Sequence, residues 1–271
     1  MSDIPPQEPR NEPPISEGYV EYPRAFSQYP GVEFRPPTLD LSVLGRAWVL
    51  IQQQLNTWIM ATLVAGVIFG IVYGCFMMVI FSLGLFGGMA SGNRSLGNSA
   101  IFLLVGIELI GALVMMLVQV TVISGLYGMA LKQLRGESIE IGDMFRLHGQ
   151  LPQLILSSIL TALVSLAAFC MCFFPVIMVQ PLLMFTVPLI LDRRMNAVDA
   201  MKLSFETLKP QMWMALLVYF ILGMVMQLGA FACGVGILVT IPIFIMSTAL
   251  LYRDFFWQPG ETDKFVPGQV L

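Results

Sequence analysis

The sequence predicts an all-α protein, a polytopic membrane bundle of about six transmembrane helices with a disordered N-terminal tail. Composition is one reason: 57% of the 271 residues are hydrophobic and 11% are charged, whereas about 25% are charged in a typical soluble domain. The charged residues also concentrate in tails and loops, which leaves long apolar runs that are candidate membrane-spanning helices. These runs cover 57–87, 101–130, 152–173, 176–192, 210–232 and 236–253.

Residues 1–38 are predicted to form a disordered, proline-rich cytoplasmic tail. Residues 1–37 contain nine of the 17 prolines and hold three arginines against six acidic residues. A segment of this composition buries too little apolar surface to offset the entropy lost on ordering. We expect the tail to act either as a solvated tether or as a docking segment for a cytosolic partner. The helical transmembrane domain is predicted over 39–254, with a short cytoplasmic tail over 255–271.

Two amphipathic stretches are predicted to be helices that lie on the membrane surface. In the first, at 41–55, the apolar residues recur at helical spacing: Leu41, Leu44, Trp48, Ile51 and Leu55. In the second, at 196–208, Asn196 is the expected N-cap, and one face carries Val198, Met201, Phe205 and Leu208. We expect Trp48 and Phe205 to lie at the depth of the lipid headgroups.

A weak internal repeat organises the chain. "PQLILSSILTALV" begins at residue 152 and "PQMWMALLVYFIL" at residue 210, and each is preceded by an amphipathic stretch and followed by a proline-bearing apolar run. The 41–130 segment has the same order, a surface helix and then a hairpin. The sequence therefore favours three units of surface helix plus helical hairpin, although two apolar strings also resemble each other by chance.

Positive charge orients the predicted spans. With six spans and both termini in the cytoplasm, 13 of the 14 Lys and Arg residues lie on the cytoplasmic side and only Arg94 lies outside. This asymmetry is what the positive-inside rule requires. Removing one span would destroy it, so the charge distribution supports six spans independently of hydropathy.

The order of three motifs in the second half resembles a known group of proteins. The motifs are "RGESIEIGDMF", "PLILDRRMNAVDAMKLSFETLK" and "CGVGILVTIPIFIMSTALLYRD". Over about 130–254 the pattern resembles a broad group of uncharacterised bacterial inner-membrane proteins, and it is similar to the membrane domain fused to some bacterial glycerophosphodiester phosphodiesterases. The resemblance implies a multi-pass helical protein of the bacterial inner membrane. It carries over no catalytic residue, because 254–271 is too short to hold the soluble catalytic domain of those enzymes.

The sequence offers no set of residues for catalysis or metal binding. The single histidine, His148, lies in a predicted cytosolic loop, and no Ser/His/Asp set can be assembled around it. No Gly-rich phosphate loop with its lysine occurs. We therefore expect a protein that is not an enzyme, with no cofactor, no bound metal and no nucleic-acid partner.

Glu108 is the one carboxylate in the apolar run at 101–130. A charge at bilayer depth is costly, and such residues tend to pair, to line a cavity or to carry a function. Helical rise, counted from the ends of the runs, places Tyr73, Gln180 and Gln227 at a similar depth. We therefore predict a buried polar layer of these four residues in the outer third of the bundle. It would serve either as structural glue or as a ligand or proton site.

Small residues and cysteines supply two further hypotheses. Gly66, Gly70 and Gly74 recur at every fourth position, a spacing that lets helix backbones approach closely in lipid. The approach would be either within the bundle or between two copies in a homodimer. Cys172 and Cys233 fall near the outer ends of their runs, where they would either form a disulfide or pack as small apolar residues.

Two functions follow from this pattern. The first is a non-enzymatic scaffold or accessory subunit, set in the lipid bilayer, that binds cytosolic or membrane protein partners through its tail and surface helices. The alternative is a small transporter or lipid-handling protein that works through the layer around Glu108. Deletion of residues 1–37 would impair the first, whereas Glu108→Gln would impair the second.

Reporter fusions test the predicted topology. Fusions after residues 40, 140, 200 and 260 are expected to report the cytoplasm, and a fusion after residue 95 is expected to report the outside, because the positive charge is so unevenly distributed. The measurement is a pair of reporters that are active on opposite sides of the membrane. An outside signal after residue 140 or 200 would contradict the six-span prediction.

Overall fold

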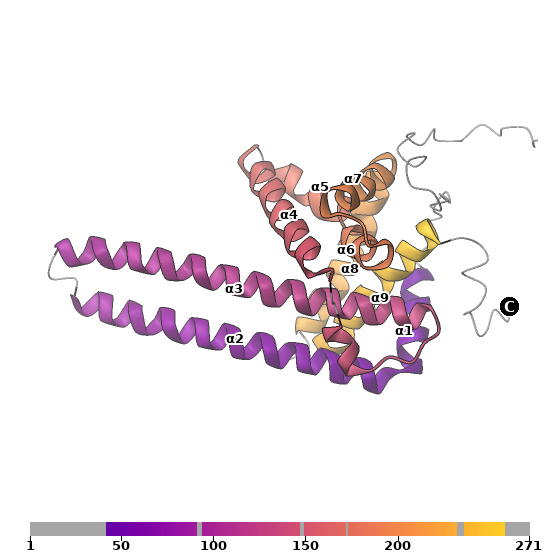
Figure 1. The fold of residues 1–271 in the computed structure, drawn as a ribbon, viewed down its shortest axis with the longest axis horizontal. Helices are drawn as coiled ribbons and strands as arrows, with labels where there is room; N and C mark the ends of the chain where they lie inside the picture. The colour runs from indigo at the N-terminus through magenta and orange to yellow at the C-terminus, as the bar shows by residue number, and fades with distance from the viewer. Residues whose placement is uncertain (1–41, 91–93, 147–148, 172, 232–235, 258–271) are drawn as a thin grey trace, which may run out of the picture.

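The structure, a computed structural model, describes residues 42–90, 94–146, 149–171, 173–231 and 236–257. Within these ranges the regular elements are helices and no strand occurs, which confirms the predicted all-α class (Figure 1). Five helical segments of this part of the chain are long and apolar enough to cross a membrane. The predicted tail at 1–38 and nearly all of the tail at 255–271 lie outside the described residues.

The longest elements are α2 (Leu55–Ala90) and α3 (Arg94–Leu134), which lie side by side as an antiparallel hairpin (Figure 1). At 1.5 Å per residue their 36 and 41 residues extend over about 54 and 61 Å. The interval between the first two apolar runs is therefore largely helical, and the far end of the hairpin projects beyond the other helices. No proline occurs between residues 38 and 151 to end either helix earlier.

The fourth apolar run, 176–192, does not form one continuous helix. After α4 (Leu151–Met171), which pairs with α5 (Phe173–Leu182), the chain turns at 183–185 and continues as α6 (Thr186–Arg193). Pro181 and Pro188 each remove a backbone donor and disfavour an unbroken helix. Because α5 and α6 have only 10 and 8 residues, neither is long enough to cross a bilayer alone.

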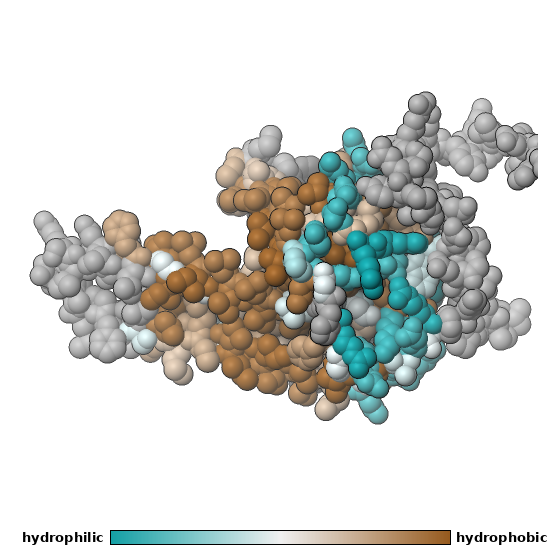
Figure 2. Space-filling view, in the orientation of Figure 1, coloured by the Kyte–Doolittle hydropathy of each residue, from teal (hydrophilic) through white to brown (hydrophobic). Residues whose placement is uncertain are grey.

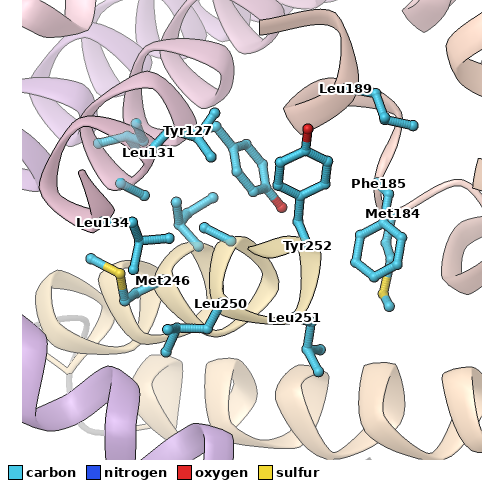
Figure 3. Packing of buried hydrophobic residues seen from close by; sticks show 14 of the residues in the cluster. Tyr127, Leu131, Leu134, Met184, Phe185, Leu189, Met246, Leu250, Leu251 and Tyr252 are labelled. Atoms are coloured by element: carbon cyan, nitrogen blue, oxygen red, sulfur yellow. The ribbon is translucent and has the colours of Figure 1, made fainter. Parts of the chain in front are cut away.

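The core is centred on α9 (Ile237–Phe256), which pairs with α8 (Met212–Phe231) and also packs against α1 (Ser42–Gln53), α2 and α3. Every residue of α9 from Met246 to Arg253 is buried. Figure 3 shows Leu131 and Leu134 of α3 beside Met246 and Leu250 of α9. On the other side of α9, the ring centroids of Phe185 and Tyr252 are 6.2 Å apart, so the turn before α6 packs directly on this helix.

The first predicted surface helix is present as α1 (Ser42–Gln53), and one of its faces packs in the bundle. Val43, Ala47 and Ile51 are buried, and the helix packs against α9, whereas Trp48 is 38% exposed. Small and β-branched residues allow closer packing of two helices than the indole of Trp48 does. The indole is thereby left on the outside of the bundle.

The second predicted surface helix is α7 (Ala197–Leu208), which joins α8 through a short 3-10 turn, η3 (Lys209–Gln211). Its buried residues include Ala197, Ala200 and Ser204, and Val198 and Phe205 are exposed. Asn196 occupies the N-cap position, but its side chain makes no capping hydrogen bond. The side-chain oxygen of Gln153, from α4, accepts the Ala197 N–H instead, at 3.0 Å. The cap therefore ties α7 to α4.

Charged residues from distant parts of the sequence meet at one end of the molecule, which we call the charged end. Ion pairs join Arg46 to Asp254, Lys132 to Asp143, and Arg135 to Asp192. These residues lie in α1, at the C-terminal ends of α3, α6 and α9, or in the 3-10 helix η2 (Ile141–Phe145). Figure 2 shows the same division, with hydrophilic residues over this end and hydrophobic residues over the hairpin.

A buried hydrogen-bond chain fixes the start of the hairpin beside the charged end. The indole N–H of Trp58 donates to the side-chain oxygen of Gln133 at 2.7 Å, and the amide N–H of Gln133 donates to the carbonyl of Leu50 at 2.6 Å. Trp58 and Gln133 are both buried, so each polar group needs its partner. One glutamine thus connects α1, α2 and α3.

Two glycines three residues apart on α3 test the packing of η2. A Cβ at Gly125 would lie 2.1 Å from the backbone oxygen of Met144, whereas a Cβ at Gly128 would have no atom within 4 Å. We expect Gly125→Ala to destabilise the fold by about 1–3 kcal/mol through overpacking. Gly128→Ala should be neutral or stabilising by up to about 1 kcal/mol, because alanine favours the helix. Thermal unfolding in detergent measures both; equal melting temperatures would contradict this packing.

Candidate functional site

A cavity of about 530 Å³ lies among α3, α4, the α5–α6 turn, α8 and α9. Its volume falls within the range of about 300–1,000 Å³ that small-molecule sites occupy. The broken fourth run lines it through Gln180, Leu183, Met184, Thr186 and Val187, and α3 and α4, which diverge from each other in Figure 1, supply most of the rest of the wall. This cavity is the candidate functional site.

The cavity has a mixed polar and apolar wall, and none of the described residues that line it is charged. Two amide side chains, Gln119 and Gln180, and two tyrosines, Tyr127 and Tyr219, contribute to the wall. Six hydroxyl side chains also line it: Ser124, Ser157, Ser158, Thr161, Ser165 and Thr186. The remaining lining residues are apolar. A wall of this kind offers hydrogen bonds without net electrostatic attraction for an ion.

The cavity is closed toward the charged end and open in the opposite direction. Along α3 the lining residues change from exposed Gln119 to buried Tyr127. Along α4 they change from buried Leu154 and Ser157 to exposed Ala162. In both helices the buried lining residues are the ones nearer to the charged end, toward the C-terminus of α3 and the N-terminus of α4. We therefore call the buried side the closed end and the side of Gln119 and Ala162 the mouth.

Several lining groups have hydrogen-bonding capacity that the chain does not use. The hydroxyl oxygens of Ser165 and Thr186 are buried and have no hydrogen-bond partner in the described part of the protein. Thr186 is only 3% exposed. Pro188, which has no N–H, also removes the donor that would bind the carbonyl of Met184 in a continuous helix. Unpaired buried polar groups are uncommon in folded proteins, so these are candidates for ligand contacts.

Asp192, at the end of α6, holds the closed end in place. Its carboxylate accepts hydrogen bonds from the hydroxyl of Tyr252 at 2.7 Å and from the indole N–H of Trp257 at 3.2 Å. The guanidinium of Arg135 also donates to it, and the Nε atom of Arg193 lies 3.6 Å away. The Asp192 side chain is 7% exposed. These contacts fasten α6 to both α3 and α9.

A second carboxylate fastens η2 to α3. Asp143 accepts from Lys132 at 2.8 Å, from Arg146 at 3.2 Å and from the backbone N–H of Glu140 at 2.9 Å. Burial by itself raises the pKa of Asp143, but these hydrogen bonds and positive charges outweigh it and hold the pKa below its ordinary value. The ion pair therefore stabilises the fold above that ordinary pKa, and the stabilisation is lost as the pH falls through the lowered one.

The four residues of the predicted polar layer do not form a buried layer in this chain. Glu108, Tyr73, Gln180 and Gln227 are all exposed, and Tyr73 is 51% exposed. Gln180 lies at the cavity, whereas Glu108 and Tyr73 belong to the projecting hairpin and Gln227 to α8. The structure brings only Gln180 to the candidate site.

The register of the hairpin explains the difference between prediction and structure. A Cβ at Gly111 would overlap the ring of Phe76, so these two residues face each other. In an antiparallel pair, Glu108 is then level with about residue 79, and Tyr73 is level with about residue 114. Glu108 and Tyr73 are therefore about 9 Å apart along the hairpin axis. The predicted depths assumed that α3 begins near residue 101. α3 instead begins at Arg94 and ends at Leu134, so the depth of Glu108 cannot be counted from residue 101.

The other predicted site residues also lie outside the cavity. Added Cβ atoms at Gly66, Gly70 and Gly74 would meet nothing within 4 Å, so no other helix of this chain packs closely on that stripe. Its alternative role, in a homodimer, stays a prediction. Cys172 and Cys233, the predicted disulfide pair, lie outside the described residues. No cluster of metal-ligating side chains occurs in the described part of the chain.

The sequence does contain a signal for the cavity, though a weak one. Ser157, Ser158, Thr161 and Ser165 fall within two turns or so of α4 and share one side of it. Hydroxyl residues are common in membrane helices because they bond to the preceding turn, so they attract less attention than a carboxylate such as Glu108. The approach of α3 and α6 to this side is a tertiary property.

The chain was also compared with known proteins. Searches against protein-family models, curated proteins and solved structures find no match. The site is therefore interpreted from its own chemistry.

The hydrogen bonds of Asp192 can be tested by truncation. Asp192→Ala leaves the hydroxyl of Tyr252 and the indole of Trp257 without their acceptor, and each lost partner costs about 1–3 kcal/mol. We expect a clear fall in melting temperature in detergent. Glu137→Ala is the control, because Glu137 is exposed near the same end and should change stability by less than about 0.5 kcal/mol. An equal effect of both substitutions would show that α6 is held by other contacts.

Proposed function

We propose that this chain is a non-enzymatic, multi-pass membrane protein that binds a lipid-like amphiphile in the cavity. The cavity itself supports this proposal: it lies among apolar helices, its wall carries unused hydrogen-bonding groups, and its mouth is open. An amphiphile has the matching division between a polar head and an apolar body. Of the functions that the sequence suggests, lipid handling fits this geometry best, with the cavity in place of the Glu108 layer.

The surroundings of the mouth support entry from the bilayer. Exposed apolar side chains flank it on both helices, including Leu117 on α3 and Leu163 and Val164 on α4. These residues belong to segments that are long and apolar enough to span a membrane. At the closed end, by contrast, buried residues separate the cavity from the charged end. A ligand would therefore enter sideways from lipid, with its polar head first.

The proposal includes six passes, with α5 and α6 together as a broken fourth pass. Their charged-end contacts support it, because Asp192 of α6 meets residues at the ends of α3 and α9. A chain that leaves this end through α4 must return to it through α5 and α6. We further propose that the charged end and both termini are cytoplasmic, as charge asymmetry suggests, and that the membrane is the bacterial inner membrane. Each hairpin, α2–α3, α4–α5 and α8–α9, would then be a unit preceded by a shorter helix.

The six-pass arrangement also places Glu108 relative to the bilayer. Glu108 lies about 38 Å from Gln133 along α3, which is more than the thickness of about 30 Å of a hydrocarbon core. With Gln133 near the cytoplasmic boundary, Glu108 reaches the opposite headgroup region, where its carboxylate meets water. The scaffold function depends mainly on the tail at 1–38, which lies outside the described residues, and it stays a prediction.

A pair of tryptophan substitutions on α4 tests the binding proposal. Ala162→Trp places an indole at the mouth, whereas Ala167→Trp places the same group on an exposed position of the same helix that does not line the cavity. We expect native mass spectrometry of the protein, released from lipid nanodiscs, to detect a retained lipid. Ala162→Trp should lose it and Ala167→Trp should keep it.

Two results would contradict the proposal. One is retention of the same lipid by Ala162→Trp and by the unchanged protein, which would place the lipid elsewhere. The other is the absence of any retained lipid from the unchanged protein. Circular dichroism of each variant serves as the control for folding.

A further inference from the structure

We infer that the cavity selects a lipid whose headgroup is uncharged and carries hydroxyl groups, and that it excludes lipids with a phosphate or carboxylate. This inference rests on the proposed function and adds the class of ligand. It depends on the balance of donors and acceptors at the closed end and on the location of the nearest charges.

The closed end is rich in hydrogen-bond acceptors. The hydroxyl protons of Ser157 and Ser158 are already donated to the carbonyls of Leu154 and Ile155, at 2.8 and 2.7 Å. Their oxygens can therefore offer only lone pairs to a ligand. Met184 also lines the cavity, and its carbonyl has no helical donor because Pro188 lacks an N–H. A ligand that satisfies these groups must donate hydrogen bonds.

The cavity also contains an unpaired hydrogen-bond donor. The hydroxyl of Thr186 has no partner, is buried, and can both donate and accept. A ligand hydroxyl has the same two capacities, so it can accept from Thr186 and donate to a neighbouring acceptor. An ionised phosphate or carboxylate group only accepts, and it would leave the acceptors at the closed end unpaired, which is costly in a buried site.

The charges of the protein do not compensate for an anionic ligand. None of the described lining residues is charged, and the nearest cations along α6 and beyond α3, Arg193 and Arg135, are committed to Asp192. An ion moved from a headgroup region into such a cavity would lose hydration without gaining a counter-charge. The uncharged lining of the cavity therefore favours a neutral headgroup over an ionised one.

Photo-crosslinking with two matched lipids tests this inference. The full chain is placed in phosphatidylcholine nanodiscs with either a photoactivatable diacylglycerol or a phosphatidic acid that has the same photoactivatable chains. Mass spectrometry then maps the labelled peptides. We expect the diacylglycerol to label the cavity segments of α4 and α6 at least about fivefold more than the phosphatidic acid, a factor that one net hydrogen bond supplies.

Variants at Thr186 locate the headgroup. Thr186→Val keeps the shape but removes the hydroxyl, and it should lower diacylglycerol labelling of the cavity about fivefold. Thr186→Ser restores a hydroxyl and should restore labelling, which separates the loss of a hydrogen bond from a folding defect. Thr121→Val is the matched control, because Thr121 lies on α3 outside the cavity lining and bonds to the carbonyl of Leu117. It should label like the unchanged protein.

The outcomes distinguish this inference from the function on which it rests. Cavity labelling by phosphatidic acid that equals or exceeds labelling by diacylglycerol would overturn the neutral-headgroup inference and leave lipid binding intact. Unchanged labelling of Thr186→Val would also overturn it, because the head would then lie elsewhere. If neither lipid labels the cavity above the exposed surface of α2, the proposed function and the inference both fail.

Discussion

The position of α6, and with it the shape of the cavity, depends on the carboxylate of Asp192. Its donors come from beyond the end of α3, from α9 and from just after α9. Because they approach from different elements, α6 cannot slide or rotate without leaving a buried polar group unpaired, at about 1–3 kcal/mol for each. The turn at 183–185 lies directly before α6 and packs on the aromatic rings of α9. The closed end is therefore a consequence of an ion-pair cluster that lies outside it.

Polar groups are distributed by type along the axis that runs from the charged end to the far end of the hairpin. Charged side chains gather at one end, where they pair with one another or meet water, and hydroxyl side chains supply the polarity of the apolar segments. Most of these hydroxyls satisfy themselves on the preceding turn of their own helix, as Thr62, Ser157 and Thr248 do. Thr186 does not, because it begins a helix just after a turn. The same residue type is thus structural in one context and available to a ligand in another.

The sequence predicts the elements of this fold better than their contacts. The apolar runs, the helices at 42–53 and 197–208 and the clustering of charge follow from composition and periodicity, which are local properties. The face of α1 that packs in the bundle could not be predicted, because Trp48 and Val43 are both apolar and only the approach of α9 distinguishes them. Pro181 and Pro188 indicate a break but not its depth. The depth of Glu108 was counted from the wrong helix start, and a start seven residues earlier changes that count by about 10 Å.

The length of the α2–α3 hairpin has a consequence for the membrane around it. The apolar segment Leu55–Ser82 has 28 residues, or about 42 Å of helix. To fit within a hydrocarbon core of about 30 Å it would need a tilt of about 45°, steeper than the range of about 0–40° found for transmembrane helices. Tilt alone does not resolve this hydrophobic mismatch, so the apolar side chains between the level of Glu108 and Ser82 extend into the headgroup region, and the adjacent lipids stretch toward them. A protein with this hairpin would concentrate in the thicker regions of its membrane and would order the acyl chains next to it.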